Sequence, residues 1–176
     1  MTILHTARLR LEPVTDQHYD AMHAMNSDPE VMTYLNAGQP ETEEHTRAAV
    51  ARIMGRWAEW GYSWWALMRT EDEVLVGLAC LQHIGGDKAK PHEIGWRLAR
   101  AGWGQGYASE AANAIVAHAF DVVGAPEVVA VAHPDNAASI KVMTRLGMQY
   151  VGMERHYDID SVVYRLARPL RQRPSP

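Results

Sequence analysis

The sequence predicts an α/β (α+β) domain in which helices cover the faces of a mixed β-sheet. Two observations predict this class. In the first half, short runs of aromatic and aliphatic residues follow one another with turn residues between them, as in hairpins. In the second half, helical and strand patterns alternate along the chain, which favours helices packed on a sheet. The length of 176 residues and the 47% hydrophobic content suit one domain.

The first half of the chain carries clear signals for strands and helix ends. Polar and apolar residues alternate in Arg8–Glu12, which is typical of a half-buried strand. Thr15 and Thr42 stand where helix N-caps belong, Pro29 suits the first position of a short helical turn, and Gly61 suits a helix end. The expected strands cover residues 8–12, 64–68, 74–81 and 93–98, and the expected helices cover residues 15–26 and 42–61.

The second half alternates between the two element types. Gly124 and Gly147 stand where helix-terminating glycines belong. We expect helices over residues 106–123 and 137–146, and strands over residues 127–132, 149–157 and 161–166. We also expect a single domain over residues 1–168 and a disordered tail over residues 169–176, which holds three prolines.

The composition argues against several classes of protein. Lys and Arg number 17 against 21 Asp and Glu, so the net charge of −4 provides no basic field for nucleic acid. The single Cys80 and the nine scattered histidines form no metal-ligand motif, so we expect no metal. No apolar run reaches the ~18 residues of a membrane span, and residues 1–11 lack a signal peptide. We therefore expect a cytoplasmic protein that does not bind membranes.

The segment from Glu93 to Ala111 carries the strongest chemical signal. It reads as a strand, then a loop with Gly102, Gly104 and Gly106 at alternate positions, then a helix. Such glycines let the backbone approach a ligand, and a helix N-terminus attracts a phosphate. The spacing matches neither the dinucleotide fingerprint nor a Walker loop. A glycine-rich turn without a ligand is the simpler alternative.

A second segment, His133–Met148, lies just after the next expected strand. Together, in this order and spacing, the two segments resemble the GNAT superfamily of acyl-CoA-dependent N-acetyltransferases. Within it, Thr6–Pro13 and Val76–Leu81 resemble the branch of ribosomal-protein N-terminal acetyltransferases of the RimJ/RimL type. The resemblance covers about residues 6–168. It implies a mostly antiparallel, twisted sheet of about seven strands with helices on both faces.

The resemblance also implies acetyl-CoA as the co-substrate. The family's glycine loop wraps the pyrophosphate of coenzyme A, and the pantetheine arm bonds to the backbone of the first of two parted strands. The asparagine of the second segment reaches the amide arm. The positions that match these cofactor contacts are Leu98, Trp103, Gly104, Gln105, Gly106, Tyr107, Ala108, Ser109 and Asn136.

Acetyl transfer to nitrogen requires a neutral amine. At pH 7, deprotonating an α-amine with a pKa of about 7.7–8.0 costs roughly 1 kcal/mol, and a lysine with a pKa of about 10.4 costs roughly 4.6 kcal/mol. Glu93 matches the family position that often supplies the base. Many members use a tyrosine as the acid where this chain has Met143, so the resemblance points to Ser139 instead. The alternatives are a solvated Glu93 and a structural Ser139.

We therefore expect an N-acetyltransferase that acts on a primary amine by direct attack in a ternary complex. The acceptor is either a protein N-terminus or a small amine, and a homodimer is common among similar proteins. Trp64 and Trp65 point to opposite faces of their strand, so one of them is expected near the acceptor. Tyr157, on a late strand, is expected to be a packing residue with a hydrogen-bonded hydroxyl. The rival functions are a non-catalytic acyl-CoA sensor and a nucleotide-binding module.

Overall fold

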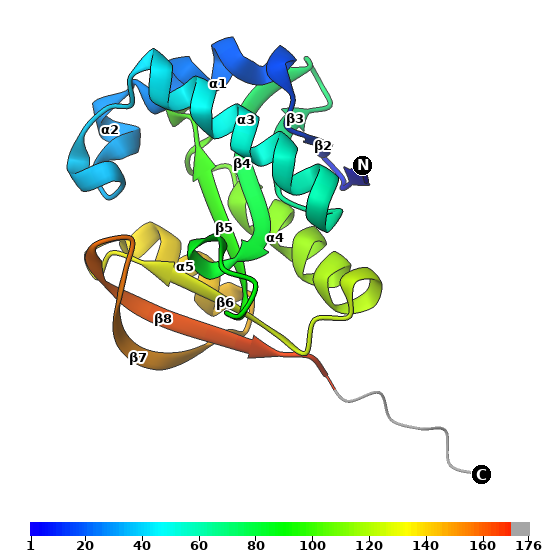
Figure 1. The fold of residues 1–176 in the computed structure, drawn as a ribbon, viewed down its shortest axis with the longest axis vertical. Helices are drawn as coiled ribbons and strands as arrows, with labels where there is room; N and C mark the ends of the chain where they lie inside the picture. The colour runs from blue at the N-terminus through cyan, green and yellow to red at the C-terminus, as the bar shows by residue number, and fades with distance from the viewer. Residues whose placement is uncertain (170–176) are drawn as a thin grey trace.

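The structure is a computed structural model that describes residues 1–169. It contains one eight-stranded sheet with the order β1-β2-β3-β4-β5-β6-β8-β7 (Figure 1). All neighbouring strands are antiparallel except β5 and β6. The strands are β1 (Leu4–His5), β2 (Leu9–Pro13), β3 (Trp64–Arg69), β4 (Val74–His83), β5 (His92–Leu98), β6 (Glu127–Ala132), β7 (Gln149–His156) and β8 (Ile159–Ala167).

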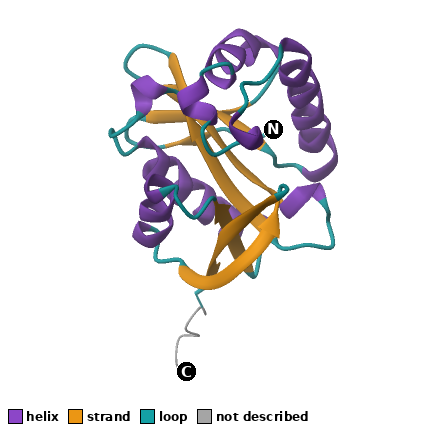
Figure 2. Cartoon of the chain, turned by 90° about the vertical axis from the view of Figure 1, so that its left-hand side faces the viewer, coloured by secondary structure: helices purple, strands orange, loops and turns teal. Residues whose placement is uncertain are grey.

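The mixed, mostly antiparallel sheet confirms the predicted class, and the short β1 adds a strand to the seven expected. Helices lie on both sides of the sheet (Figure 2). The α-helices are α1 (Tyr19–Asn26), α2 (Pro29–Met32), α3 (Glu43–Trp60), α4 (Tyr107–His118) and α5 (Ala137–Arg145). The short helices are η1 (Asp16–His18), η2 (Asn36–Gly38), η3 (Ile84–Gly86), η4 (Arg100–Gly102) and the π-helical turn η5 (Ala119–Val123).

Two expected helices differ in detail from those observed. The helix expected from Thr15 opens with the 3-10 turn η1 before α1 begins. The helix expected over residues 106–123 begins one residue later, because Gly106 is its N-cap, and its final turn widens into η5. The expected tail over residues 169–176 lies, from residue 170 on, outside the described residues.

The core lies between the sheet and its helices. Trp65 of β3 is fully buried and meets the ring of Trp57 edge to face at 4.9 Å. Met143 of α5 belongs to the same buried cluster, which extends along the chain from Leu9 to Met148. Within residues 1–169, no helix is both long and apolar enough to cross a membrane.

The sheet opens between β5 and β6. These parallel strands pair only at His92 with Val128 and at Glu93 with Val129. Beyond that point β5 continues its ladder with β4, and β6 continues its ladder with β8. The two strands therefore part into a wedge, which begins at Glu93 and widens toward the end of β5.

Candidate active site

The edge of β5 that faces the wedge carries backbone groups that β4 does not use. The amide of Ala99 donates to the carbonyl of Val76 at 3.0 Å. This bond shows which alternate residues of β5 hydrogen-bond to β4. Because alternate residues of an antiparallel strand bond to the same neighbour, Trp96 and Leu98 direct their N–H and C=O groups toward the wedge. The structure thus places the predicted Leu98 on an edge that can bond to an extended ligand.

The loop after β5 presents its backbone to solvent. Gly104 and Gly106 have φ angles of +72° and +82°, in the left-handed region that favours glycine. No side chain caps α4 at Gly106, and the first N–H groups of a helix have no acceptor within it. Among the described residues, the buried Oγ of Ser109 also has no hydrogen-bond partner. These donors and the positive end of the helix dipole fit a phosphate or pyrophosphate.

Three other predicted residues of this region contribute in different ways. The indole N–H of Trp103 donates to the carbonyl of Leu98 at 3.0 Å, so this half-exposed side chain fastens the loop to the end of β5. Tyr107 and Ala108 are buried. They can therefore offer a ligand their backbone N–H groups but not their side chains.

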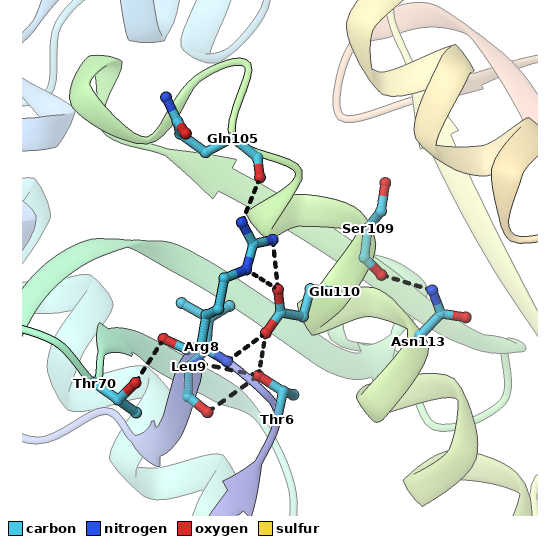
Figure 3. A network of polar contacts seen from close by, with 8 residues as sticks. All are labelled: Thr6, Arg8, Leu9, Thr70, Gln105, Ser109, Glu110 and Asn113. Atoms are coloured by element: carbon cyan, nitrogen blue, oxygen red, sulfur yellow. Dashed lines mark hydrogen bonds and ion pairs between the residues drawn. The ribbon is translucent and has the colours of Figure 1, made fainter.

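Arg8, just before β2, holds the glycine loop in place (Figure 3). Its guanidinium donates to the carbonyl of Gln105 at 2.9 Å and to Glu110 Oε2 at 2.8 Å, and it lies 4.7 Å from the centre of the Tyr107 ring. Burial alone would raise the pKa of Glu110, but hydrogen bonds from Thr6 and Arg8 outweigh it and lower that pKa. The charged Glu110 thus anchors Arg8 beside the loop.

Replacing Arg8 by alanine should weaken the binding of coenzyme A about five- to tenfold, because the loop loses its tie at Gln105 and a nearby positive charge. Isothermal titration with coenzyme A measures the dissociation constant. Arg10→Ala is the matched control, since Arg10 pairs instead with Glu12 and Glu73. An unchanged dissociation constant in Arg8→Ala would show that the loop keeps its shape without this contact.

Glu93 begins the wedge and is buried, with 5% of its surface exposed. Its Oε2 accepts hydrogen bonds from the Gln82 side-chain amide at 3.0 Å and from the Tyr157 hydroxyl. No residue within 1–169 donates a hydrogen bond to the other carboxylate oxygen, Oε1. Burial raises the pKa of this carboxyl, although these hydrogen bonds oppose the rise. A carboxylate with one anchored oxygen and one open oxygen can take a proton from a substrate.

Gln82 is itself fixed by two donors. Its Oε1 accepts from Arg56 of α3 at 2.7 Å and from the indole of Trp64 at 3.2 Å. These bonds turn the amide nitrogen of Gln82 toward Glu93. Of the two neighbouring tryptophans on β3, Trp64 therefore touches the network around the acid, and Trp65 belongs to the core.

Asn136 and Ser139 lie at the start of α5. The side chain of Asn136 accepts from the Ser139 amide at 3.1 Å and so caps the helix. Glu93 bonds instead to Gln82 and Tyr157, so the structure places the two predicted catalytic residues in separate hydrogen-bond networks. Met143, at the position of the family's tyrosine, is buried in the core.

The segment after α1 contacts residues that follow both parted strands. Arg100, which follows β5, forms an ion pair with Glu30 of α2 at 2.5 Å. Tyr34 stacks on His133, which follows β6, with ring centres 5.3 Å apart. Residues 30–34 are therefore attached to the chain beyond both parted strands.

Sequence reasoning missed the role of Tyr157. It was expected to pack on a late strand with its hydroxyl hydrogen-bonded. The hydroxyl is hydrogen-bonded, to Glu93, but Tyr157 lies in the turn between β7 and β8 with its ring half-exposed. The expected packing was wrong because a turn residue does not follow the alternation of the strand before it. Among residues 1–169, no three His, Cys, Asp or Glu side chains form a group that could hold a metal ion.

Known proteins resemble this chain over most of its length. The family model described as an acetyltransferase (GNAT) domain matches residues 8–149. YoaA, an uncharacterized N-acetyltransferase of Bacillus subtilis, is 29% identical over 173 residues, which cover 95% of this chain and 97% of YoaA. An FsC-acetyl coenzyme A-N(2)-transacetylase of Aspergillus fumigatus is 30% identical over 161 residues, which cover 84% of this chain and 65% of that protein.

Solved structures agree with this match. A GNAT-family acetyltransferase from Bacillus anthracis has a TM-score of 0.81 at 26% identity, over 95% of this chain and 99% of that one. RimL, a ribosomal L7/L12 alpha-N-protein acetyltransferase solved with coenzyme A, has a TM-score of 0.80 at 20% identity, over 94% of this chain and 98% of that one. The second likeness concerns the fold alone. The domain match and the shared fold lead to one conclusion: this chain belongs to the GNAT family of acetyltransferases.

Proposed function

We propose that this protein transfers the acetyl group of acetyl-CoA to a primary amine by direct attack within a ternary complex. One observation carries the proposal: β5 bears a buried acid where the wedge begins and leads into the glycine loop where the wedge widens. Leu98 lies five residues after Glu93 along the strand, a distance of about 17 Å. An extended thioester carrier would reach from the loop to the acid along this edge.

The residues of the loop and of the β5 edge suit coenzyme A. When bound, acetyl-CoA supplies an activated acetyl thioester. The N–H groups at the start of α4 and the unpartnered Ser109 Oγ would hold its pyrophosphate. The backbone of Trp96 and Leu98 would bond to the pantetheine arm, and Asn136 could reach the arm while it caps α5. Trp103, Gly104, Gln105, Gly106, Tyr107 and Ala108 complete the proposed contact set.

Glu93 is the proposed general base. Its Oε1 takes a proton from the amine, directly or through a water, while the nitrogen attacks the acetyl carbonyl carbon. The C–N bond forms, the C–S bond breaks, and the sulfur leaves as a thiolate that then gains a proton. Glu93 acts as a base only when it is ionised. Because burial raises the pKa of Glu93, the enzyme should lose activity as the pH falls through this raised pKa.

Ser139 is proposed to hydrogen-bond near the departing sulfur. A thiol with a pKa near 8.5 is a good leaving group and needs little help. Replacing Ser139 by alanine should therefore lower kcat about threefold to tenfold and leave the dissociation constant of coenzyme A unchanged. A fall as large as that of a Glu93 variant would instead assign proton donation to Ser139.

The acceptor is proposed to be either a protein N-terminus or a small amine. The names of two similar proteins support a nitrogen acceptor: RimL is an alpha-N-protein acetyltransferase, and the Aspergillus protein is an N(2)-transacetylase. The RimJ/RimL branch, a homodimer and a cytoplasmic location stay predictions from the sequence. Incubation with acetyl-CoA and two panels, peptides with open N-termini and small amines, tests the acceptor by mass spectrometry through a gain of one acetyl group.

The test also separates the enzyme from its rivals. With saturating acetyl-CoA, turnover of at least one amine is expected, whereas a sensor would bind the cofactor without turnover. Coenzyme A at 100 times its dissociation constant should add about 2.7 kcal/mol to the free energy of unfolding, and ATP at the same concentration much less. Equal stabilisation by both ligands would favour a nucleotide-binding module.

A further inference from the structure

The tip of the β7–β8 hairpin has an unusual backbone. Tyr157 and Asp158 have φ angles of +51° and +63°, although neither residue is glycine. A tyrosine in the left-handed region costs of order 1 kcal/mol or more and persists where other contacts hold it. The contacts of the Tyr157 hydroxyl hold this residue in its conformation.

The Tyr157 hydroxyl makes all three hydrogen bonds that a phenol can make. It donates to Glu93 Oε2, and it accepts from the backbone amide of Gly85 at 3.1 Å and from the Gln82 amide at 3.4 Å. A phenol offers one donor and two acceptor sites. Its partners come from β5, η3 and β4, so the hairpin tip is fastened to three segments distant in the chain.

These bonds determine which oxygen of Glu93 is open. Gln82 and Tyr157 both donate to Oε2, and Gln82 cannot rotate without losing Arg56 and Trp64 on its own oxygen. The acid is thus held in one orientation by donors from two sides. Oε1 takes no hydrogen bond from any residue that the structure describes.

We infer that Tyr157 is a positioning residue: its hydroxyl anchors Oε2 of Glu93, so that Oε1 faces the acceptor amine as an ionised base. The inference rests on the proposed function of Glu93. It also explains why a strained tyrosine stands at this turn, since a shorter side chain there would not reach the acid.

Several titratable groups face Glu93 besides Tyr157. The guanidinium of Arg56 approaches from α3, and the imidazole of His156 lies on the same hairpin as Tyr157. Cys80 is a buried neighbour on β4, and burial raises the pKa of its thiol, which stays neutral. A hydrogen bond to a carboxylate favours its charged form. Removing the Tyr157 hydroxyl should therefore raise the pKa of Glu93 further.

The test is the pH profile of Tyr157→Phe, which keeps the ring and loses only the hydroxyl. We expect the acidic limb of kcat/KM to move up by about one pH unit, so that activity falls about tenfold at low pH and approaches the parent value above pH 9. Tyr150→Phe is the matched control, because Tyr150 is an exposed tyrosine of the same hairpin. Its profile should match the parent.

The outcomes separate this inference from the proposed function. The positioning role is overturned if the acidic limb of kcat/KM does not shift in Tyr157→Phe, or if kcat/KM falls equally at every pH. This holds even if Glu93→Gln is inactive. A fully active Glu93→Gln overturns the base itself. Carbon-detected NMR titration of the Glu93 carboxyl, assigned by its loss in Glu93→Gln, gives a second readout without turnover. An upward shift in Tyr157→Phe is expected there too.

Discussion

Replacing Glu93 by glutamine should lower kcat/KM for acetyl transfer about 100- to 10,000-fold near neutral pH, the usual contribution of a general base. Glutamine has the same shape and can still accept from Gln82 and Tyr157, so the fold and the wedge should remain. The dissociation constant of coenzyme A should change less than twofold, because the glycine loop proposed to hold its pyrophosphate lies at the other end of β5. Steady-state kinetics and titration of coenzyme A measure the two quantities.

Glu127→Gln provides the control for the loss of a carboxylate. Glu127 lies on the neighbouring strand β6 and pairs with Arg165 at the surface, and so should not affect turnover. If Glu93→Gln kept the activity of the parent from pH 6 to pH 9, another group would have to accept the proton. The parent itself should lose activity below the pKa of Glu93, which burial raises above its ordinary value.

Replacing Gly77 by alanine should destabilise the protein by about 2–3 kcal/mol, a typical cost of overpacking. A Cβ atom on Gly77 of β4 would lie 2.5 Å from the backbone oxygen of Arg97 and would also overlap the side chain of Leu98. β4 would have to move away from β5. The melting temperature should fall by roughly 5–10 °C, and coenzyme A should bind more weakly because Leu98 shifts.

Gly55→Ala is the matched glycine control. Gly55 lies inside α3, and a Cβ there would meet no atom within 4 Å. Alanine should stabilise this helix by up to about 1 kcal/mol. Differential scanning calorimetry of both variants distinguishes steric overlap from a general effect of glycine replacement. If Gly77→Ala had the melting temperature of the parent, β4 and β5 would be able to move apart at little cost in free energy.

Much of the fold could be predicted because its signals are local. The predicted N-cap Thr42 accepts a hydrogen bond from an amide within its own first turn, and Gly61 adopts the left-handed conformation that ends α3. The glycine loop could be predicted for the same reason. The left-handed conformations of Gly104 and Gly106 are favoured by the residue type itself and do not depend on distant contacts. Such features depend on a few consecutive residues, and so the sequence reveals them directly.

The environment of Glu93 could not be predicted from local patterns. Its partners Gln82 and Tyr157 are 11 and 64 residues away, and the second of them depends on how the β7–β8 hairpin bends. The wedge was expected only through the family resemblance. Alternation within β5 and β6 predicts which side chains are buried, but not where two parallel strands stop pairing.

The short pairing between β5 and β6 has a mechanical consequence. Backbone bonding divides the sheet into two panels, β1–β5 and β6–β8, joined at a seam of two residue pairs. Helix packing must supply the remaining stiffness across this seam. A ligand bound between the panels would stiffen the seam. Catalysis would then take place at a flexible junction that the bound substrate itself makes rigid.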